Sequence, residues 1–227
     1  MRVLIVAAHP DDEVLGCGGT IARLVSQGHE VFVLFISEGV SSRGMFPLDN
    51  SWNPQIRQRE VYALNASTVL GFQIVGFLRY PNLRMTGIPI LELAKEIETT
   101  ISKFTPDTIY THHFGDMNSD HRITYEAVIT ACRPKPSMSV RRIYTFEIPS
   151  STEWGQAAGL PVFSANRYVD ISNFFPQKME ALRCYAEEMR LPPHPRSTDG
   201  VEALARLRGF SVCLPFAEAF SVIRELD

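Results

Sequence analysis

The first two thirds of the chain alternate between short apolar runs and longer segments with helical periodicity. The apolar runs, each typical of a buried strand, span residues 2–8, 30–36, 72–78, 108–112 and 141–148. The segments between them place apolar residues three and four positions apart and span residues 16–27, 54–70, 89–104 and 119–132. Strands joined by helices of this length form right-handed crossovers in a mainly parallel sheet. The sequence therefore predicts an α/β, Rossmann-like fold with a mainly parallel sheet flanked by helices.

The last third departs from this alternation. Its segments are a short apolar run, two helical segments and a closing stretch, at residues 167–171, 176–189, 198–207 and 217–226. The prolines of Leu191–Ser197 exclude a helix there and hold His194 in an extended loop. No linker or repeat divides the chain, so we expect one domain over residues 1–227. Residues 1–150 would form its core, and residues 151–227 would pack on that core and on the site.

The composition is that of an ordinary globular protein, with 45% hydrophobic residues and a net charge of −3. This mild acidity argues against a nucleic-acid partner, which normally requires a basic face. No apolar run approaches the roughly 20 residues of a membrane span, and the N-terminal run is too short for a signal peptide. We therefore expect a cytoplasmic protein, and a homo-oligomer stays open. The four cysteines are scattered and are expected to be free thiols: Cys17, Cys132, Cys184 and Cys213.

The most informative motif is His9-Pro10-Asp11-Asp12-Glu13, which follows the first apolar run directly. It places an imidazole and adjacent carboxylates on the turn between a buried strand and a helix. Open α/β sheets gather ligands and catalytic groups at this location, outside the carboxyl ends of their strands. A cluster of negative charge there requires a positive partner, and a divalent metal is the simplest candidate.

A second polar cluster, residues 111–122 (THHFGDMNSDHR), follows the fourth predicted strand and precedes a helix. Loops at the carboxyl ends of parallel strands emerge on one edge of the sheet, so the two clusters can meet. His9 and Asp12 with His121 would then form a set of two imidazoles and one carboxylate. This set leaves a position open for water, as catalytic rather than structural zinc sites do.

The motifs AHPDDE and D-x-N-x-D-H resemble those of the LmbE-like / PIG-L family of zinc-dependent N-acetyl deacetylases, over about residues 1–150. The resemblance implies the LmbE-like fold and an N-acetylated amino-sugar molecule or conjugate as the substrate. It implies one Zn²⁺ per chain, or Fe²⁺ in the same place, held by His9, Asp12 and His121. It also implies Asp11 as the general base, which the position of this carboxylate beside the ligands permits.

One residue departs from the family pattern. Several members carry a histidine three positions before the last ligand, where this chain has Asn118. Asp120 is retained and would orient an imidazole. We therefore hypothesise that His194 supplies the general acid, with His113 as the rival candidate. The residues expected to contact the substrate are Arg43, Arg57, Asn118 and Arg196.

Three alternatives remain open. The run Gly16-Cys17-Gly18-Gly19 invites a dinucleotide-binding interpretation that Glu38 could complete, but HPDDEVL separates these glycines from the strand. A two-metal phosphoesterase would use Asp11, Asp12, Asp116, Asp120, His9 and His121. A metal-binding protein without turnover is the third alternative, which Asn118 makes conceivable. Near the first motif, we expect Glu13 to complement the helix dipole and Cys17 to form a pocket wall.

Overall fold

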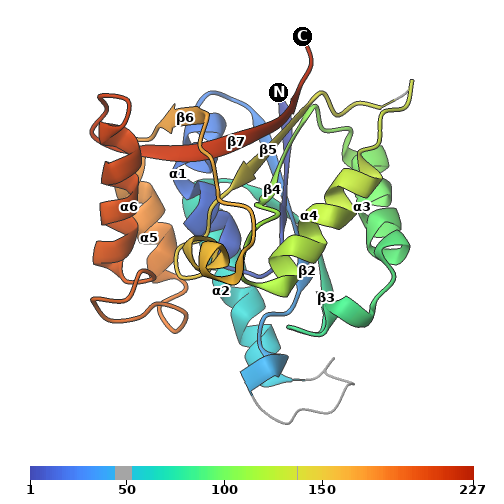
Figure 1. Cartoon of the computed structure of the whole chain (residues 1–227), viewed down its shortest axis with the longest axis horizontal. Helices are drawn as coiled ribbons and strands as arrows, with labels where there is room; N and C mark the ends of the chain where they lie inside the picture. Colours follow the sequence, from blue (N-terminus) through green and yellow to red (C-terminus); the bar gives the residue numbers. More distant parts are fainter. Residues whose placement is uncertain (44–52, 137) are drawn as a thin grey trace.

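The computed structural model describes residues 1–43, 53–136 and 138–227 (Figure 1). They form a seven-stranded sheet with the strand order β3-β2-β1-β4-β5-β7-β6. The first five strands are mutually parallel: β1 (Arg2–Ala7), β2 (Glu30–Ser37), β3 (Gln73–Tyr80), β4 (Thr108–His112) and β5 (Arg142–Phe146). The predicted α/β fold with a mainly parallel sheet is thereby confirmed.

Helices cover both faces of the sheet (Figure 1). One face carries α1 (Asp12–Ser26), α2 (Pro54–Leu70), α5 (Phe175–Arg183) and α6 (Thr198–Phe210). The other face carries α3 (Ile90–Phe104) and α4 (Ser119–Ala131). The short 3₁₀ helices are η1 (Ser41–Arg43), η2 (Met85–Gly87) and η3 (Thr152–Ala158). Within the described residues, no helix is long and apolar enough to cross a membrane.

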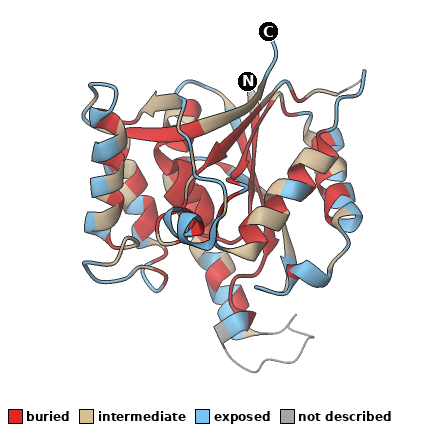
Figure 2. Cartoon of the chain, viewed as in Figure 1, coloured by how far each residue is buried: buried red, intermediate tan, exposed pale blue. Residues whose placement is uncertain are grey.

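The central strand β1 is buried on both faces because helices cover both sides of the sheet (Figure 2). Val3, Ile5 and Ala7 belong to the core under α1 and α2, whereas Leu4 and Val6 belong to the core under α3 and α4. This strict alternation explains the continuous apolar run of the sequence, since a strand with one solvated face would alternate with polar residues.

The last third of the chain extends the same sheet. The segment from Ala217 to Glu225 forms β7, which inserts between β5 and β6 (Arg167–Asp170) and is antiparallel to both. The predicted strand at 167–171 is thereby confirmed. The predicted helix at 176–189 is wrong in its second half, since α5 ends at Arg183 and residues 184–188 form turns.

Helix α1 begins at Asp12, earlier than the expected residue 16, and its backbone is non-helical at Cys17. The glycines lie inside this helix, where they allow it to approach the sheet closely. A Cβ atom on Gly16 would lie 2.5 Å from Cδ2 of Phe146, and one on Gly19 would lie 2.8 Å from Cβ of Ile171. The dinucleotide interpretation is therefore wrong, because these glycines contact side chains of the core and not an open phosphate loop.

We predict that Gly19→Ala destabilises the fold by about 1–3 kcal/mol, the usual effect of overpacking a core. The clash falls on the Cβ atom of buried Ile171, which cannot rotate away. Urea unfolding of the two proteins measures the difference. The control is Gly87→Ala, since a Cβ at this exposed glycine meets nothing within 4 Å; an equal loss in both variants would contradict the explanation.

Candidate metal centre and active site

The two polar motifs meet at the carboxyl edge of the sheet. Strands β1 and β4 pair in parallel, so the loop after β1 and the loop after β4 emerge side by side. His9 and Asp12 come from the first loop and the first turn of α1, and His121 comes from the first turn of α4. All three side chains are buried, with residue exposures of 6%, 1% and 1%.

The donor atoms of these residues fit one cation. All of them lie within 4.8 Å of one another. His9 Nδ1 is 3.2 Å from Asp12 Oδ2, and His121 Nε2 is 3.4 Å from the same oxygen. Ligands at about 2.0–2.1 Å from a tetrahedral Zn²⁺ are about 3.3–3.5 Å apart. The set of two imidazoles and a carboxylate therefore suits Zn²⁺ or another divalent transition metal, and it leaves one corner open.

Both imidazoles are backed by a further carboxylate. His9 Nε2 is 3.2 Å from Asp120 Oδ2, and His121 Nδ1 is 3.1 Å from Asp116 Oδ2. Such partners fix the ring orientation and the tautomer of metal-binding histidines. Asp120 also accepts a hydrogen bond from the Leu83 backbone N–H at 2.8 Å. Asp120, expected to orient the imidazole of the general acid, instead contacts His9 of the candidate metal group.

Asp116 is held by the loop that leads to η3. Its carboxylate accepts hydrogen bonds from the Ser151 hydroxyl, from the Thr152 hydroxyl at 2.6 Å and from the Asn118 backbone N–H at 2.8 Å. Four neighbours therefore share this carboxylate, with His121 as the fourth. The Asp116 carboxylate is therefore placed to support His121, one of the candidate metal ligands.

The electrostatics of the cluster favour a bound cation. Burial lowers the pKa of the His121 imidazole, but the carboxylates of Asp116 and Asp12 outweigh it and raise this pKa to about 10. Burial alone would raise the pKa of Asp12, whereas the charges of His121 and His112 hold it well below its usual range. In both cases the carboxylates keep a positively charged group beside them. A divalent ion would take the place of that positive group.

His112, the last residue of β4, lies beside Asp12 and His121. Its Nε2 accepts a hydrogen bond from the Ala8 backbone N–H at 2.8 Å, so the ring is neutral at this nitrogen. The ring stacks on His121 with 4.0 Å between centroids. Burial lowers its pKa well below the usual value, and the neighbouring charge of His121 lowers it further. His112 therefore serves as packing for His121.

Asp11 faces the pocket from a strained backbone. Its φ of 133° is in a region that side-chain-bearing residues rarely adopt, and such strain is concentrated at functional sites. Oδ1 is 3.1 Å from the Arg59 guanidinium, and Oδ2 is 3.2 Å from that of Arg196. Burial raises the pKa of Asp11, and the two arginines oppose this effect. The carboxylate is thus next to the ligands without belonging to the group of three.

Glu13 supports this arrangement from inside the core. Its carboxylate accepts a hydrogen bond from the Asp11 backbone N–H at 3.0 Å and from the Tyr185 hydroxyl at 2.6 Å. Burial raises the pKa of Glu13 to about 8. This side chain therefore fixes the turn that carries Asp11.

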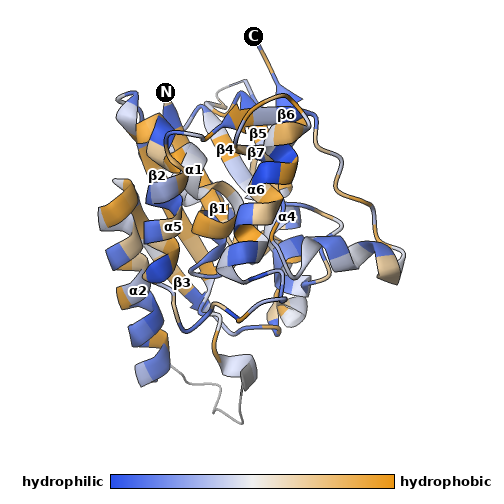
Figure 3. Ribbon diagram, turned by 90° about the vertical axis from the view of Figure 1, so that its left-hand side faces the viewer, coloured by the Kyte–Doolittle hydropathy of each residue, from blue (hydrophilic) through white to orange (hydrophobic). Residues whose placement is uncertain are grey.

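Arg59 is a site residue that the sequence analysis missed in favour of Arg57. Arg59 is buried, and it donates to the backbone oxygens of Pro10 and Gly39 besides its contact with Asp11. Arg57 is exposed on α2, whose first turns are hydrophilic (Figure 3). The sequence signal for Arg59 was its helical spacing. Arg59 lies three residues after Ile56 and four before Ala63, and so it shares the inward-facing stripe of α2 with them.

The structure places only some of the other residues expected to contact the substrate near the metal centre. A cavity of about 110 Å³ adjoins the metal centre and is lined by His9, Asp11, Gly39, Arg59, Asn82, Leu83, Asn118, His121 and Arg196. Asn118 and Arg196 therefore lie where a substrate would be contacted. Asn118 also caps α4, since its side chain accepts from the Asp120 backbone N–H at 2.9 Å. The side chain of Arg43 lies outside the described residues.

Neither histidine expected as a general acid is among the described residues that line this cavity. The His194 ring packs edge-on against Trp154, and its Nδ1 accepts from the Arg196 backbone N–H at 3.1 Å. His113 Nε2 is 2.9 Å from the Pro161 backbone oxygen, and its ring packs against Phe163. The proline-rich loop thus brings Arg196 to the site in place of His194.

The structure disfavours a second metal ion. Two guanidinium groups hold Asp11, so a further cation there would face strong repulsion. Asp116 and Asp120 are turned toward His121 and His9. The carboxylates that the two-metal alternative requires are therefore already occupied within the described site.

The metal centre predicts one Zn²⁺ per chain, lost on Asp12→Ala. It also predicts that Asp116→Asn binds zinc about 10- to 100-fold more weakly, the usual effect of removing the partner of a metal-binding histidine. Equilibrium dialysis against zinc measures both. His29→Ala, outside the cluster, should bind as the wild type does, and an Asp12→Ala protein that retains its full zinc content would contradict the assignment.

Comparison with known proteins agrees with this geometry. The family model for PIG-L, described as GlcNAc-PI de-N-acetylase, matches residues 4–132. The deacetylase YaiS of Escherichia coli K12 is 30% identical over 154 residues, which cover 66% of this chain and 75% of the relative. The diacetylchitobiose deacetylase of Thermococcus kodakarensis is 28% identical over 199 residues, which cover 82% of this chain and 70% of the relative.

Among solved structures, GalB, a 4-carboxy-2-hydroxymuconate hydratase from Pseudomonas putida KT2440, is similar with a TM-score of 0.77. The identity is 19%, and the match covers 100% of this chain and 97% of that structure, so the likeness concerns the fold. The family match spans both motifs that hold His9, Asp12 and His121. The resemblance identified in the sequence is confirmed, and the chain belongs to the PIG-L family of de-N-acetylases.

Proposed function

We propose that this protein hydrolyses the N-acetyl group of a small molecule or conjugate that contains N-acetylglucosamine. One observation carries the proposal: a buried cluster of two imidazoles and a carboxylate lies beside a separate carboxylate, Asp11, at an open cavity. The sugar comes from the family description and from relatives such as the diacetylchitobiose deacetylase. The amide chemistry agrees with the arrangement of the site.

His9, Asp12 and His121 would hold the metal, and a bound Zn²⁺ supplies a Lewis acid that lowers the pKa of water toward 7 and polarises a carbonyl group. The role of Asp11 is to take the proton of the attacking water. Its burial supports this role, because a carboxyl group with a raised pKa is a better base near neutral pH. Arg59 and Arg196 fix the two oxygens of Asp11 and so determine where that proton is received.

The departing amine requires a proton when the C–N bond breaks. Since His194 and His113 do not line the described cavity, we assign this proton to Asp11 as well. The carboxylate would accept the proton from water and return it to the nitrogen, which yields acetate and a free amine. Two asparagines, Asn82 and Asn118, line the cavity, and we assign the contact with the acetamido group to Asn118.

The first test is a panel of N-acetylglucosamine, diacetylchitobiose and N-acetylglucosaminyl malate, assayed for free amine and acetate with zinc-loaded protein. We expect release from at least one compound, and its loss after treatment with a chelator. Phosphate release from phosphate esters under the same conditions would favour the two-metal alternative. A protein that binds zinc and releases neither product would support a binding role.

Asp11→Asn should lower kcat about 10²- to 10⁴-fold, the range that general acid–base catalysis contributes. Its zinc content should be unchanged, since Asp11 is outside the ligand group. The matched control is Asp199→Asn, because Asp199 is an exposed residue of α6. Turnover of Asp11→Asn close to that of the control would rule out this carboxylate as the base.

His194→Ala and His113→Ala should both keep kcat within a few-fold of the wild type if Asp11 carries both protons. A loss on the scale of Asp11→Asn in either histidine variant, with normal zinc content, would restore that histidine as the general acid. The same panel of substrates measures these rates.

Arg59 is proposed as a positioning residue for Asp11. Arg59→Lys keeps the buried charge but loses the planar fork that also contacts Gly39 and Pro10. We expect kcat to fall on the order of 10²-fold, the effect of a small misplacement of a catalytic group, with little change in KM. Arg57→Lys on the exposed side of α2 is the control; equal kinetics of the two variants would contradict this role.

A further inference from the structure

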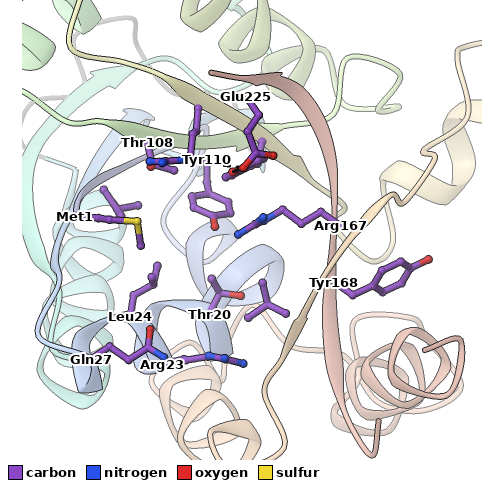
Figure 4. Close-up of a pocket in the computed structure, with 14 residues that line it drawn as sticks. Met1, Thr20, Arg23, Leu24, Gln27, Thr108, Tyr110, Arg167, Tyr168 and Glu225 are labelled. Carbon is purple, nitrogen blue, oxygen red and sulfur yellow. Dashed lines mark hydrogen bonds and ion pairs between the residues drawn. The ribbon is translucent and has the colours of Figure 1, made fainter. Parts of the chain in front are cut away.

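A second cavity lies at the amino-terminal ends of the parallel strands, away from the loops that carry the candidate metal ligands, and its lining residues are drawn in Figure 4. Its strand residues come from the first halves of the parallel strands, where Val3, Tyr110 and Tyr144 line it from β1, β4 and β5. The metal ligands, by contrast, follow the strand ends. The cavity measures about 310 Å³, which is at the lower end of the range for small-molecule sites.

The cavity is closed by α1 and by the antiparallel end of the sheet. The first half of α1 packs closely on the core through Gly16 and Gly19. After these glycines, Thr20 and Leu24 of the same helix line the cavity (Figure 4). From the other side, Arg167 reaches from β6 toward the Tyr110 hydroxyl.

Two polar atoms behind the wall of the cavity are buried without partners. Thr20 is only 2% exposed, and its Oγ1 has no hydrogen-bond partner among the described residues. The Nε of Arg167 is also buried and has none. Because the protein itself encloses these two atoms, an occupant of the cavity would meet the other polar atoms of the wall, above all those of its arginines.

The charge of the cavity favours an anion. Arg23, Arg142 and Arg167 line it, against one carboxylate, Glu225. Glu225 is engaged, since it accepts from the Tyr144 hydroxyl at 2.9 Å and lies 3.9 Å from Arg142. Arg142 also contacts Asp107, and Arg23 donates to the Asp170 backbone oxygen at 2.7 Å.

Arg167 differs from the other two arginines because its neighbours are aromatic rings. Its guanidinium lies 4.4 Å from the centroid of the Tyr144 ring and hydrogen-bonds with Tyr110. No carboxylate of the described chain forms an ion pair with it. A guanidinium that stacks on a ring presents its N–H groups in the ring plane, where a planar carboxylate can take two of them.

We propose that this cavity binds a small organic carboxylate with an apolar or aromatic body. Its carboxylate pairs with Arg167, and its body lies against Val3, Leu24 and the Tyr110 ring. One guanidinium without a carboxylate partner matches a single negative charge, whereas a phosphate dianion would need more donors. This inference does not depend on the proposed deacetylase activity.

The probe is sodium benzoate, titrated into the full chain by calorimetry, with benzamide as the neutral isostere and inorganic phosphate as the compact anion. We expect saturable binding of benzoate and none of the other two. Because carboxylates also bind zinc, the titration is repeated after chelator treatment. Binding that disappears with the metal, or equal binding of benzamide, would overturn the proposal, as would no binding of benzoate at millimolar concentration.

Variants locate the site. Arg167→Gln should weaken benzoate binding about tenfold or more, since it removes a charge-assisted hydrogen bond. Tyr110→Phe keeps the packing and should weaken it several-fold. Arg133→Gln, on an exposed position outside the cavity, is the control and should bind as the wild type does. Thermal melting verifies that each variant is folded, and wild-type affinity in both cavity variants would place benzoate elsewhere.

Discussion

The buried carboxylate of Asp12 is the constraint on which the site depends. It accepts from the His9 backbone N–H, lies near the imidazoles of His9, His112 and His121, and begins helix α1. A charge at this depth is tolerated only with positive partners around it. The parallel pairing of β1 and β4 supplies them, because it brings the loop that carries Asp12 to the helix that carries His121.

The second layer of the site follows from the same requirement. The ring nitrogens of His9 and His121 that face away from Asp12 lie near Asp120 and Asp116. Asp11 lies next to this cluster but is held by Arg59 at one carboxylate oxygen and by Arg196 at the other. Two neighbouring aspartates in the sequence thus have different surroundings, imidazoles for one and guanidinium groups for the other, and different chemistry follows from that difference.

The fold and the meeting of His9, Asp12 and His121 in one candidate metal site could be predicted from the sequence, because both follow from local patterns and one rule. Apolar runs mark the buried strands, and the carboxyl ends of parallel strands share an edge. Residues placed by tertiary packing could not be predicted in this way. To predict Arg59, the inward face of α2 has to be distinguished from the face that carries Arg57. On the sequence alone, the proline-rich loop could place either His194 or Arg196 at the site. The insertion of β7 between β5 and β6 left no local signal.

At its glycine contacts, backbone atoms of α1 and not its side chains set the spacing between this helix and the sheet. At Gly16 and Gly19 the helix lies directly on Phe146 and Ile171, with no interlocking side chain of its own that could change rotamer. At these two points the start of α1, and with it Asp12, cannot come nearer to the sheet without displacing Phe146 or Ile171.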